Sequence, residues 1–299
     1  MIDFRLKVFD TVARRLSFTK AAEELYISQP AVTKHIKELE RQMNLRLFER
    51  RGNRVALSEG GRILLKHTEA IHDIARQLED ELNMLHEVHR GSLSIGASTT
   101  IAQYVLPPLL AMFHRLYAEV RLSMLTANTE QIENALLQHT IMLGIIEGES
   151  KRRDIIYTPF ARDEILLVCN PAHPLARKDD IRLDELAATP LLLREPGSGT
   201  LEVIANGLKL AGLRLSDMTV EMHLGSSESI KSYLMYSQNC MAFISKDAVK
   251  KELEEGLLKT LRVRKLSMHR QLYFITLHGQ SGGLVELFMR FGLQHHTQR

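Results

Sequence analysis

The chain has 299 residues, a formal net charge of +3 and a hydrophobic content of 44%, which fits a globular protein of two or three compact units. It shows no leading apolar segment of signal-peptide type and no run of about 18 apolar residues, so we expect a cytoplasmic protein without membrane contact. Two cysteines, Cys169 and Cys240, exclude a disulfide framework; both lie in apolar runs and are predicted to be buried, unreactive thiols.

The N-terminal segment has the pattern of three helices. Apolar residues at helical spacing predict a first helix over residues 4–15. Ser17 or Thr19 can cap a second helix, and Ser28 can cap a third that runs to about Gln42. The short connection between the second and third helices is typical of a helix-turn-helix.

A basic hairpin follows these helices. Leu45, Leu47 and Phe48 are predicted to point into the core, and Gly52-Asn53 is a dipeptide suited to the positive φ of a tight turn. Residues 1–60 hold 12 Lys or Arg against 8 Asp or Glu, a net charge of +4, which leaves the rest of the chain at −1. The positive excess lies where phosphate contact is expected in a winged helix-turn-helix.

Polar and basic side chains on the predicted outward face are of the types that read base edges or hold phosphates. The candidate DNA-binding residues are Thr19, Ser28, Gln29, Pro30, Thr33, Lys34, Lys37, Arg50, Arg51 and Arg54. Gln29 and Thr33 are expected to face bases, and Lys37 and the three arginines to contact phosphates. Taken singly, each basic residue also fits a solvated helix face.

This segment resembles the LysR-type transcriptional regulators. The matching positions are Phe9, Ser17-Phe18-Thr19, Ala21-Ala22, Leu25, Ser28-Gln29-Pro30-Ala31-Val32, Ile36, Leu39-Glu40, Leu45, Leu47-Phe48, Arg50, Leu57-Ser58 and Gly61. Lys34 stands where the family often has Arg, and Ser58 where it often has Thr; the first change bears on the half-site sequence because Lys is the less directional base reader. The resemblance implies a transcription regulator that binds double-stranded DNA at an inverted-repeat operator, with RNA polymerase as a further candidate partner.

A long helix is predicted from Ser58 to about His89. Leu64, Ile71, Leu78 and Leu85 repeat every seven residues, with Ala75 and Leu82 between them and Thr68 as the weak position. This is the seam of a coiled coil, and it predicts a homodimer or homotetramer with paired DNA-binding units. The alternative is a helix buried against its own domain.

From Leu93 onward, strand-like and helical segments alternate, which predicts an α/β domain. The complete fold prediction is α/β: a winged helix-turn-helix over residues 1–58, a linker and dimerisation helix over 59–89, and an effector-binding domain over 90–299 that resembles periplasmic binding proteins. Subdomain I spans about 90–161 and 268–299, and subdomain II about 162–267. The chain is expected to cross between them near 160–164 and 265–271, and the last helix to fold back on subdomain I.

The loops that follow the predicted strands are small and rich in hydroxyl groups. Ligands of open α/β sheets bind beyond the carboxyl ends of strands, and such loops suit an anion or a carboxylate. The candidate effector-binding residues are Ser98, Thr99, Thr100, Gln103, Thr129, Glu147, Gly197, Ser198, Gly199, Thr200 and Ser226. Glu147 would repel an anion unless a basic group offsets it, or it could accept a hydrogen bond from a donor ligand. Any single Ser or Thr could instead be a helix cap. The loop GASTTI resembles the sulfur-assimilation and carbon-fixation branches of the family, which suggests inorganic sulfur anions and phosphorylated or carboxylated metabolites as effectors.

Other chemistry has weak support. GSGTLE lacks the third glycine of a dinucleotide loop, and HEVH at residues 86–89 is one residue short of a zinc-protease motif. We therefore expect no catalytic residue, no metal and no cofactor. The competing hypotheses are a substrate-binding protein for transport, which the basic N-terminal unit opposes, and an α/β enzyme.

Overall fold

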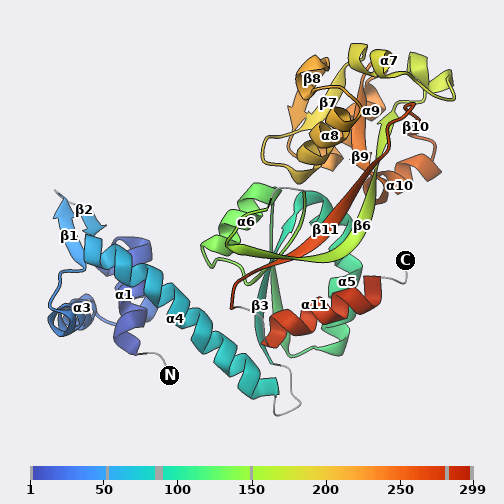
Figure 1. Cartoon of the computed structure of the whole chain (residues 1–299). Coiled ribbons are helices and arrows are strands. Elements are labelled where there is room, and N and C mark those ends of the chain that lie inside the picture. The colour runs from blue at the N-terminus through green and yellow to red at the C-terminus, as the bar shows by residue number, and fades with distance from the viewer. Residues whose placement is uncertain (1–2, 52–53, 85–89, 149–150, 280–282, 297–299) are drawn as a thin grey trace. The chain divides into compact units, whose positions relative to one another are not determined.

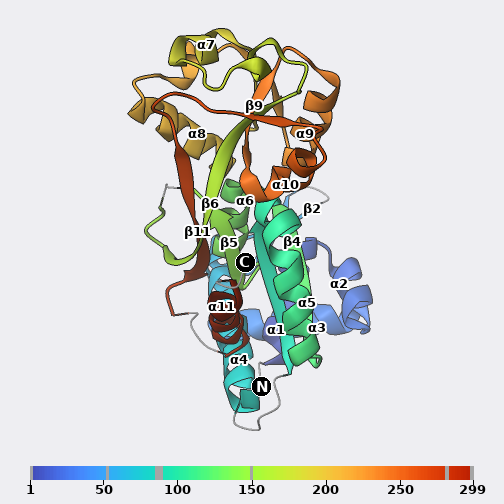
Figure 2. The same ribbon diagram turned by 90° about the vertical axis from the view of Figure 1, so that its right-hand side faces the viewer.

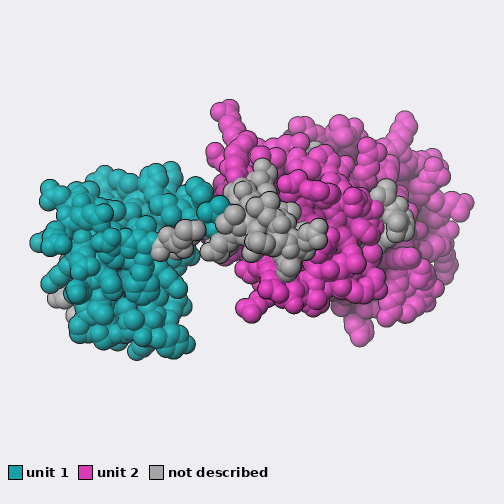
Figure 3. Space-filling model, turned by 90° about the horizontal axis from the view of Figure 1, so that it is seen from below, with its two compact units in different colours: residues 1–85 teal, residues 86–299 magenta. Residues whose placement is uncertain are grey.

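The computed structural model describes residues 3–51, 54–84, 90–148, 151–279 and 283–296. The chain divides into two compact units, residues 1–85 and 86–299 (Figure 3). The first is mainly helical, and the second is an α/β unit with helices on both faces of a mixed sheet (Figure 1). The predicted fold class is confirmed.

The N-terminal unit is a winged helix-turn-helix. Its elements are α1 (Phe4–Arg15), α2 (Phe18–Leu25), α3 (Gln29–Met43), β1 (Phe48–Arg51), β2 (Arg54–Leu57) and α4 (Glu59–Met84). Ser17 caps α2 by accepting the backbone N–H of Lys20, and Ser28 caps α3 by accepting that of Ala31. These caps satisfy first-turn donors that have no partner within the helix.

The hairpin of β1 and β2 is held to the helices by a partly buried hydrogen bond and by aromatic packing. Glu40 of α3 accepts the backbone N–H of Leu47 at 2.8 Å, and the ring of Phe48 packs against those of Phe9 at 5.5 Å and Phe18 at 5.6 Å. Leu45 is 59% exposed, so its predicted inward orientation is wrong. The left-handed C-cap of α3 turns the chain outward before Leu47 enters the core. The predicted turn at 52–53 lies outside the described residues.

The long helix α4 uses two different apolar faces. Leu64 packs against the core of its own unit and Thr68 is fully buried, so the beginning of the predicted seam is not free for a partner helix. Ile71 and Leu78 are exposed, as is Ile74 between them, which is 66% exposed. The first turns of α4 pack against α1, which moves the solvent-facing apolar stripe toward Ile74. Leu85 lies outside the described residues.

One nine-stranded mixed sheet forms the centre of the C-terminal unit, in the order β4-β3-β5-β11-β6-β9-β7-β8, with β10 also paired to β6. The strands are β3 (Gly91–Ser98), β4 (Val120–Ala127), β5 (Leu143–Glu147), β6 (Ile155–Cys169), β7 (Leu191–Arg194), β8 (Val220–Leu224), β9 (Met241–Ser245), β10 (Lys259–Leu261) and β11 (Met268–Leu277). The helices are α5 (Leu106–Leu116), α6 (Thr129–Leu137), α7 (Leu183–Ala188), α8 (Gly199–Leu210), α9 (Ser227–Tyr236), α10 (Lys246–Glu254) and α11 (Gly283–His296). Short helical turns η1 (Ile101–Val105), η2 (Pro174–Arg177) and η3 (Leu215–Asp217) complete the unit.

Two long strands, β6 and β11, connect the subdomains (Figure 1). They pair antiparallel from Met268 opposite Ile165 to Leu277 opposite Ile155. At one end β11 also pairs with β5 of subdomain I, and at the other end β6 pairs with β9 of subdomain II. The two subdomains therefore share the only strands that cross between them in the described part of the chain, and a small bend in these strands would move one subdomain against the other.

Helices cover both faces of each half-sheet. In subdomain I, α11 folds back beside α5, as predicted, with the ring of Phe113 at 5.0 Å from Phe288 and 5.3 Å from Phe291 (Figure 2). The other face is covered by α6 through Ile132 and Leu136. In subdomain II, α8 packs on one face and α9 and α10 on the other. Ligand sites of open α/β sheets form beyond the carboxyl ends of parallel strands, here those of β3, β5, β7 and β8.

Candidate functional site

The outward face of α3 carries a preformed polar pair. Gln29 Nε2 donates to Thr33 Oγ1 at 3.0 Å, and Thr33 Oγ1 lies 3.1 Å from the backbone oxygen of Gln29. Lys34 and Lys37 are exposed on the same helix. The Gln29 amide is therefore held in position while its remaining donor and acceptor stay free for a base edge.

A groove of about 590 Å³ lies between the start of α2, α3 and the hairpin. Thr19, Gln29, Thr33 and Lys37 all line it. Ser28 and Pro30 lie at the start of α3, where the Ser28 hydroxyl is used as a cap. Arg50, Arg51 and Arg54 are on the two strands of the hairpin, and their side chains lie outside the described residues.

In the C-terminal unit, Glu147 is the centre of a buried polar network between the subdomains. The Ser98 hydroxyl donates to its carboxylate, and the Thr200 hydroxyl donates to Oε1 at 3.2 Å. Ser98 ends β3, Glu147 ends β5 and Thr200 begins α8 in the other subdomain. All three residues are at most 3% exposed, so these hydroxyls are dedicated to the carboxylate rather than to solvent.

Arg270 of β11 offsets the charge of Glu147. Its Nη1 lies 3.1 Å from Glu147 Oε1 and donates to Thr200 Oγ1 at 2.8 Å, while its Nη2 lies 2.7 Å from Asp163 Oδ2. Burial raises the pKa of Asp163, against the lowering effect of Arg270 and of a hydrogen bond from Ser245. One guanidinium thus serves two buried carboxylates. Sequence reasoning missed Arg270 and Asp163, although a charged residue inside an apolar strand is a usable signal.

The start of α8 lies against the end of β5. Thr129 Oγ1 donates to the Glu147 backbone oxygen at 3.0 Å and accepts the N–H of Gly199 at 3.2 Å. A Cβ at Gly199 would collide with the same Glu147 oxygen, so only glycine permits this approach. The backbone N–H of Glu130 also donates to the Gly197 oxygen at 3.1 Å. The glycine-rich loop is therefore a contact between the subdomains.

A second contact joins η1 to α9, where the Thr100 and Ser227 hydroxyls are 3.3 Å apart and buried. Sequence reasoning did not name Ser227. The candidate residue Ser226 caps α9, since its hydroxyl accepts the N–H of Ser229. Ser198 is buried at the start of α8.

Two further candidate effector residues lie outside this contact. Thr99 donates to the Ala127 backbone oxygen at 3.2 Å within subdomain I. Gln103 is exposed on η1.

A hollow of about 540 Å³ opens beside this interface. Thr129, Gly197, Ser198 and Gly199 line it together with Glu130, Glu133, Glu202, Lys151 and Arg152. Arg152 is paired with Glu133 at 2.9 Å, and the Lys151 ammonium lies 5.1 Å from the Tyr273 ring centre. The hollow therefore combines three carboxylates with two cations that already have partners.

The two cysteines are free and buried. Burial raises the pKa of Cys169 to about 11, which keeps it a neutral thiol. Among the described residues, no group of three or more His, Cys, Asp or Glu side chains could hold a metal ion. Within the same ranges, no helix has the length and apolar character needed to cross a membrane.

Family comparison covers both units. Residues 4–62 match the family "Bacterial regulatory helix-turn-helix protein, lysR family", and residues 86–297 match the "LysR substrate binding domain". The chain belongs to the LysR family. It is a DNA-binding transcriptional regulator with an effector-binding domain, and not an enzyme.

Two relatives fall in the branches suggested by GASTTI. A "Probable RuBisCO transcriptional regulator" of Cyanophora paradoxa is 31% identical, over 97% of this chain and 92% of that protein. The "HTH-type transcriptional regulator CysL" of Bacillus subtilis is 32% identical, over 90% of this chain and 89% of that one.

Solved structures share the fold. Full-length OxyR from Pseudomonas aeruginosa matches with a TM-score of 0.73 at 19% identity, covering 99% of this chain and 95% of that one. CbnR in complex with its target DNA gives 0.67 at 19% identity, over 99% and 100% of the two chains. The regulatory domain of Synechocystis CcmR in complex with 2-PG gives 0.63 at 24% identity, over 70% and 99%.

Proposed function

We propose that this regulator senses a small anionic or carboxylated effector in the cleft between subdomains I and II, and passes that signal to an inverted-repeat operator. The observation that carries the proposal is the buried network of Ser98, Glu147, Thr200 and Arg270, which joins both subdomains through hydroxyl groups and charges. A ligand that binds in the cleft would shift the balance between an intact and a broken network only through its differential affinity for the two.

One observation from the structure and one from the relatives support the chemical class of the effector. The hydroxyl groups of Thr100 and Ser227 and the N-terminus of α9 border the cleft, which favours an oxyanion there. CcmR was solved with 2-PG, and the relatives include a RuBisCO regulator and CysL. Phosphorylated or carboxylated metabolites and inorganic sulfur anions are therefore the first candidates.

A homodimer or homotetramer would supply the paired DNA-binding units. The stripe of Ile71, Ile74 and Leu78 on α4 is exposed in the single chain, and the two edge strands of the sheet, β4 and β8, expose Met124 and Met222. A second copy that covers these surfaces would remove them from water. Bound next to a promoter, such an oligomer would also meet RNA polymerase.

The effector part is tested by a thermal-shift screen of small anions and organic acids on the full chain. A ligand at about 100 times its dissociation constant stabilises the folded state by roughly 2.7 kcal/mol. Thr100→Val keeps the side-chain shape and removes the hydroxyl that lies 3.3 Å from the Ser227 hydroxyl, so it should abolish the shift. Thr189→Val, whose hydroxyl bonds the Glu185 backbone oxygen outside the cleft, is the matched control and should keep it. A shift that survives Thr100→Val would place the ligand elsewhere.

The assembly is tested by sedimentation. Ile71→Asp combined with Leu78→Asp would bury charge in an interface built from the α4 stripe. The double variant should sediment as a smaller species and bind an inverted repeat poorly. An assembly of unchanged size would mean that α4 does not hold it, and Met124→Asp with Met222→Asp would then test the sheet edges.

A further inference from the structure

Arg194 is a buried arginine with an unused donor. It ends β7 and is 2% exposed, and its Nε and Nη2 donate to the Glu195 carboxylate at 2.8 and 2.9 Å. Nη2 also reaches the Gly225 backbone oxygen at 3.3 Å. Nη1 is buried and has no hydrogen-bond partner, and Arg194 is the one arginine of the described residues in that condition. A buried charged donor without an acceptor is costly, so a bound group that supplies an acceptor would be stabilised.

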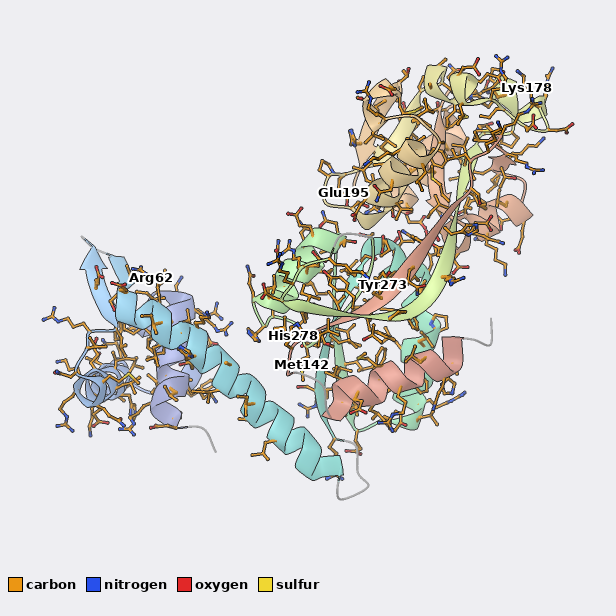
Figure 4. The ribbon with its side chains drawn as sticks, in the orientation of Figure 1. Arg62, Met142, Lys178, Glu195, Tyr273 and His278 are labelled. Carbon is orange, nitrogen blue, oxygen red and sulfur yellow. The ribbon has the colours of Figure 1, made fainter. Side chains whose placement is uncertain are left out.

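Arg194 lies at the cleft between subdomains I and II. The segment that follows it contacts subdomain I, since the Asn128 amide donates to the Pro196 oxygen at 3.4 Å. Gly225, on the other side of the guanidinium, comes two residues before Ser227, which contacts Thr100 of subdomain I. Figure 4 shows Glu195 at the edge of subdomain II that faces α6. The guanidinium thus lies between two loops that both reach the other subdomain.

The charge distribution of the cleft distinguishes this end from the other. Around Glu147, one guanidinium serves two carboxylates, Glu147 and Asp163, so that end carries an excess of negative charge and repels an anion. At the Arg194 end, one guanidinium faces one carboxylate, and the Glu195 side chain is 25% exposed and able to turn to water. The N-terminus of α9, which starts at Ser227, adds a positive partial charge there.

We propose that Arg194 is the anion-recognising residue of the cleft, binding an anionic oxygen group of the effector through Nη1 beside the Thr100–Ser227 contact. The inference rests on the proposed effector role of the cleft and specifies which end of it takes the charge. An oxyanion at Nη1 gains charge-assisted hydrogen bonds from a group that is already dehydrated and held in place. Glu147, with its hydroxyl donors and Arg270, holds the two subdomains together and does not contact the ligand.

The test uses the full chain and three probes, inorganic phosphate, sulfate and malonate, titrated calorimetrically at constant ionic strength. Phosphate, sulfate and malonate separate tetrahedral from carboxylate recognition, and at least one of them should bind the wild type. Arg194→Lys keeps the charge but loses the planar fork, and should weaken that binding about 10- to 100-fold. Arg194→Gln combined with Glu195→Gln, which leaves no unpaired carboxylate, should abolish it.

Arg182→Gln is the matched control. Arg182 lies on the same subdomain with a side chain that is 62% exposed and paired with Asp184. Arg182→Gln removes one positive charge, a larger change in net charge than either Arg194 variant makes, and should still leave anion binding unchanged. If Arg194→Lys bound the probes as tightly as the wild type, or if the wild type bound none of them, the proposal would be overturned. Binding of an inverted-repeat operator, followed by fluorescence anisotropy in the same preparations, tests the regulator separately: intact, ligand-responsive operator binding without anion binding would refute only the role of Arg194.

Anomalous diffraction can locate the bound anion directly, which tests the proposal even if an Arg194 variant fails to fold. Crystals of the wild-type chain soaked in selenate should give an anomalous selenium peak beside Arg194 Nη1. A peak only elsewhere in the cleft would contradict the assignment.

Discussion

Removal of the Arg270 side chain is the sharpest test of how the subdomains are held together. Arg270→Met deletes contacts of 3.1 Å or less to Glu147, Asp163 and Thr200 and leaves two buried carboxylates without their cation. Breaking a buried pair in this way costs about 3–5 kcal/mol. With a urea slope of about 2 kcal/mol per molar, the unfolding midpoint should fall by roughly 1.5–2.5 M.

The assay is urea unfolding of the full chain followed by tyrosine fluorescence. The chain has no tryptophan, and Tyr26 is the only one of its seven tyrosines in the N-terminal unit, so the signal reports mainly the C-terminal unit. Arg264→Met is the matched control, because Arg264 pairs with Asp180 at 2.9 Å with its side chain 63% exposed. That exposed pair should contribute about 1 kcal/mol or less.

Neutralising the orphaned carboxylates should restore stability. Adding Glu147→Gln and Asp163→Asn to Arg270→Met removes both unpaired charges, and replacing a whole buried ionic group is often close to neutral. The triple variant should regain most of the lost midpoint. An Arg270→Met midpoint that fell no further than that of Arg264→Met would refute the reasoning, since the buried network would then contribute no more than a surface pair.

Three further predictions concern DNA reading, the thiols and pH. Gln29→Ala should cost about 1–3 kcal/mol on the operator and relax its sequence preference, whereas Lys37→Ala should weaken binding to all sequences and lower the salt slope by about one; equal losses of Gln29→Ala on operator and random DNA in anisotropy titrations would contradict the base-reading role. Cys169, with its pKa raised to about 11 by burial, should react with a thiol reagent only after unfolding, and fast labelling of the native chain at Cys169 would contradict its burial. Burial lowers the pKa of His173 below its usual 6.5, so the unfolded chain binds the proton more tightly and stability should fall as pH drops below about 6.5. His173→Asn, which keeps a side-chain acceptor for the N–H of Leu175, should have a melting temperature less dependent on pH than the wild type, and equal pH dependence would exclude His173 as the cause.

The N-terminal unit was largely predictable from sequence because its determinants are local. Ser17 and Ser28 cap their helices through bonds to residues three positions away, and helical spacing identifies the buried stripe without knowledge of partners. The failure at Leu45 has the same origin: the left-handed Asn44 changes the chain direction at one residue, and no periodicity records that change.

The polar contacts between the two subdomains were predictable only in outline. Strand ends identified Ser98, Thr100, Glu147 and Thr200 because parallel strands place their carboxyl ends at one edge. Whether a hydroxyl near such an edge faces the cleft depends on the turn that follows, and so Ser226 is a cap while the neighbouring Ser227 makes the contact to Thr100.

By itself, the sequence determined the family, the fold class and the loops from which a ligand site can be built, because helix caps, strand periodicity and the signature around α3 are short-range properties. Only the tertiary structure decided how charge is distributed across the cleft. Arg270 and Glu147 are separated by more than a hundred residues in the chain, yet β11 and β5 are adjacent in the sheet and bring them to 3.1 Å. The free nitrogen of Arg194 likewise depends on which acceptors its neighbours supply, and long-range packing sets that balance.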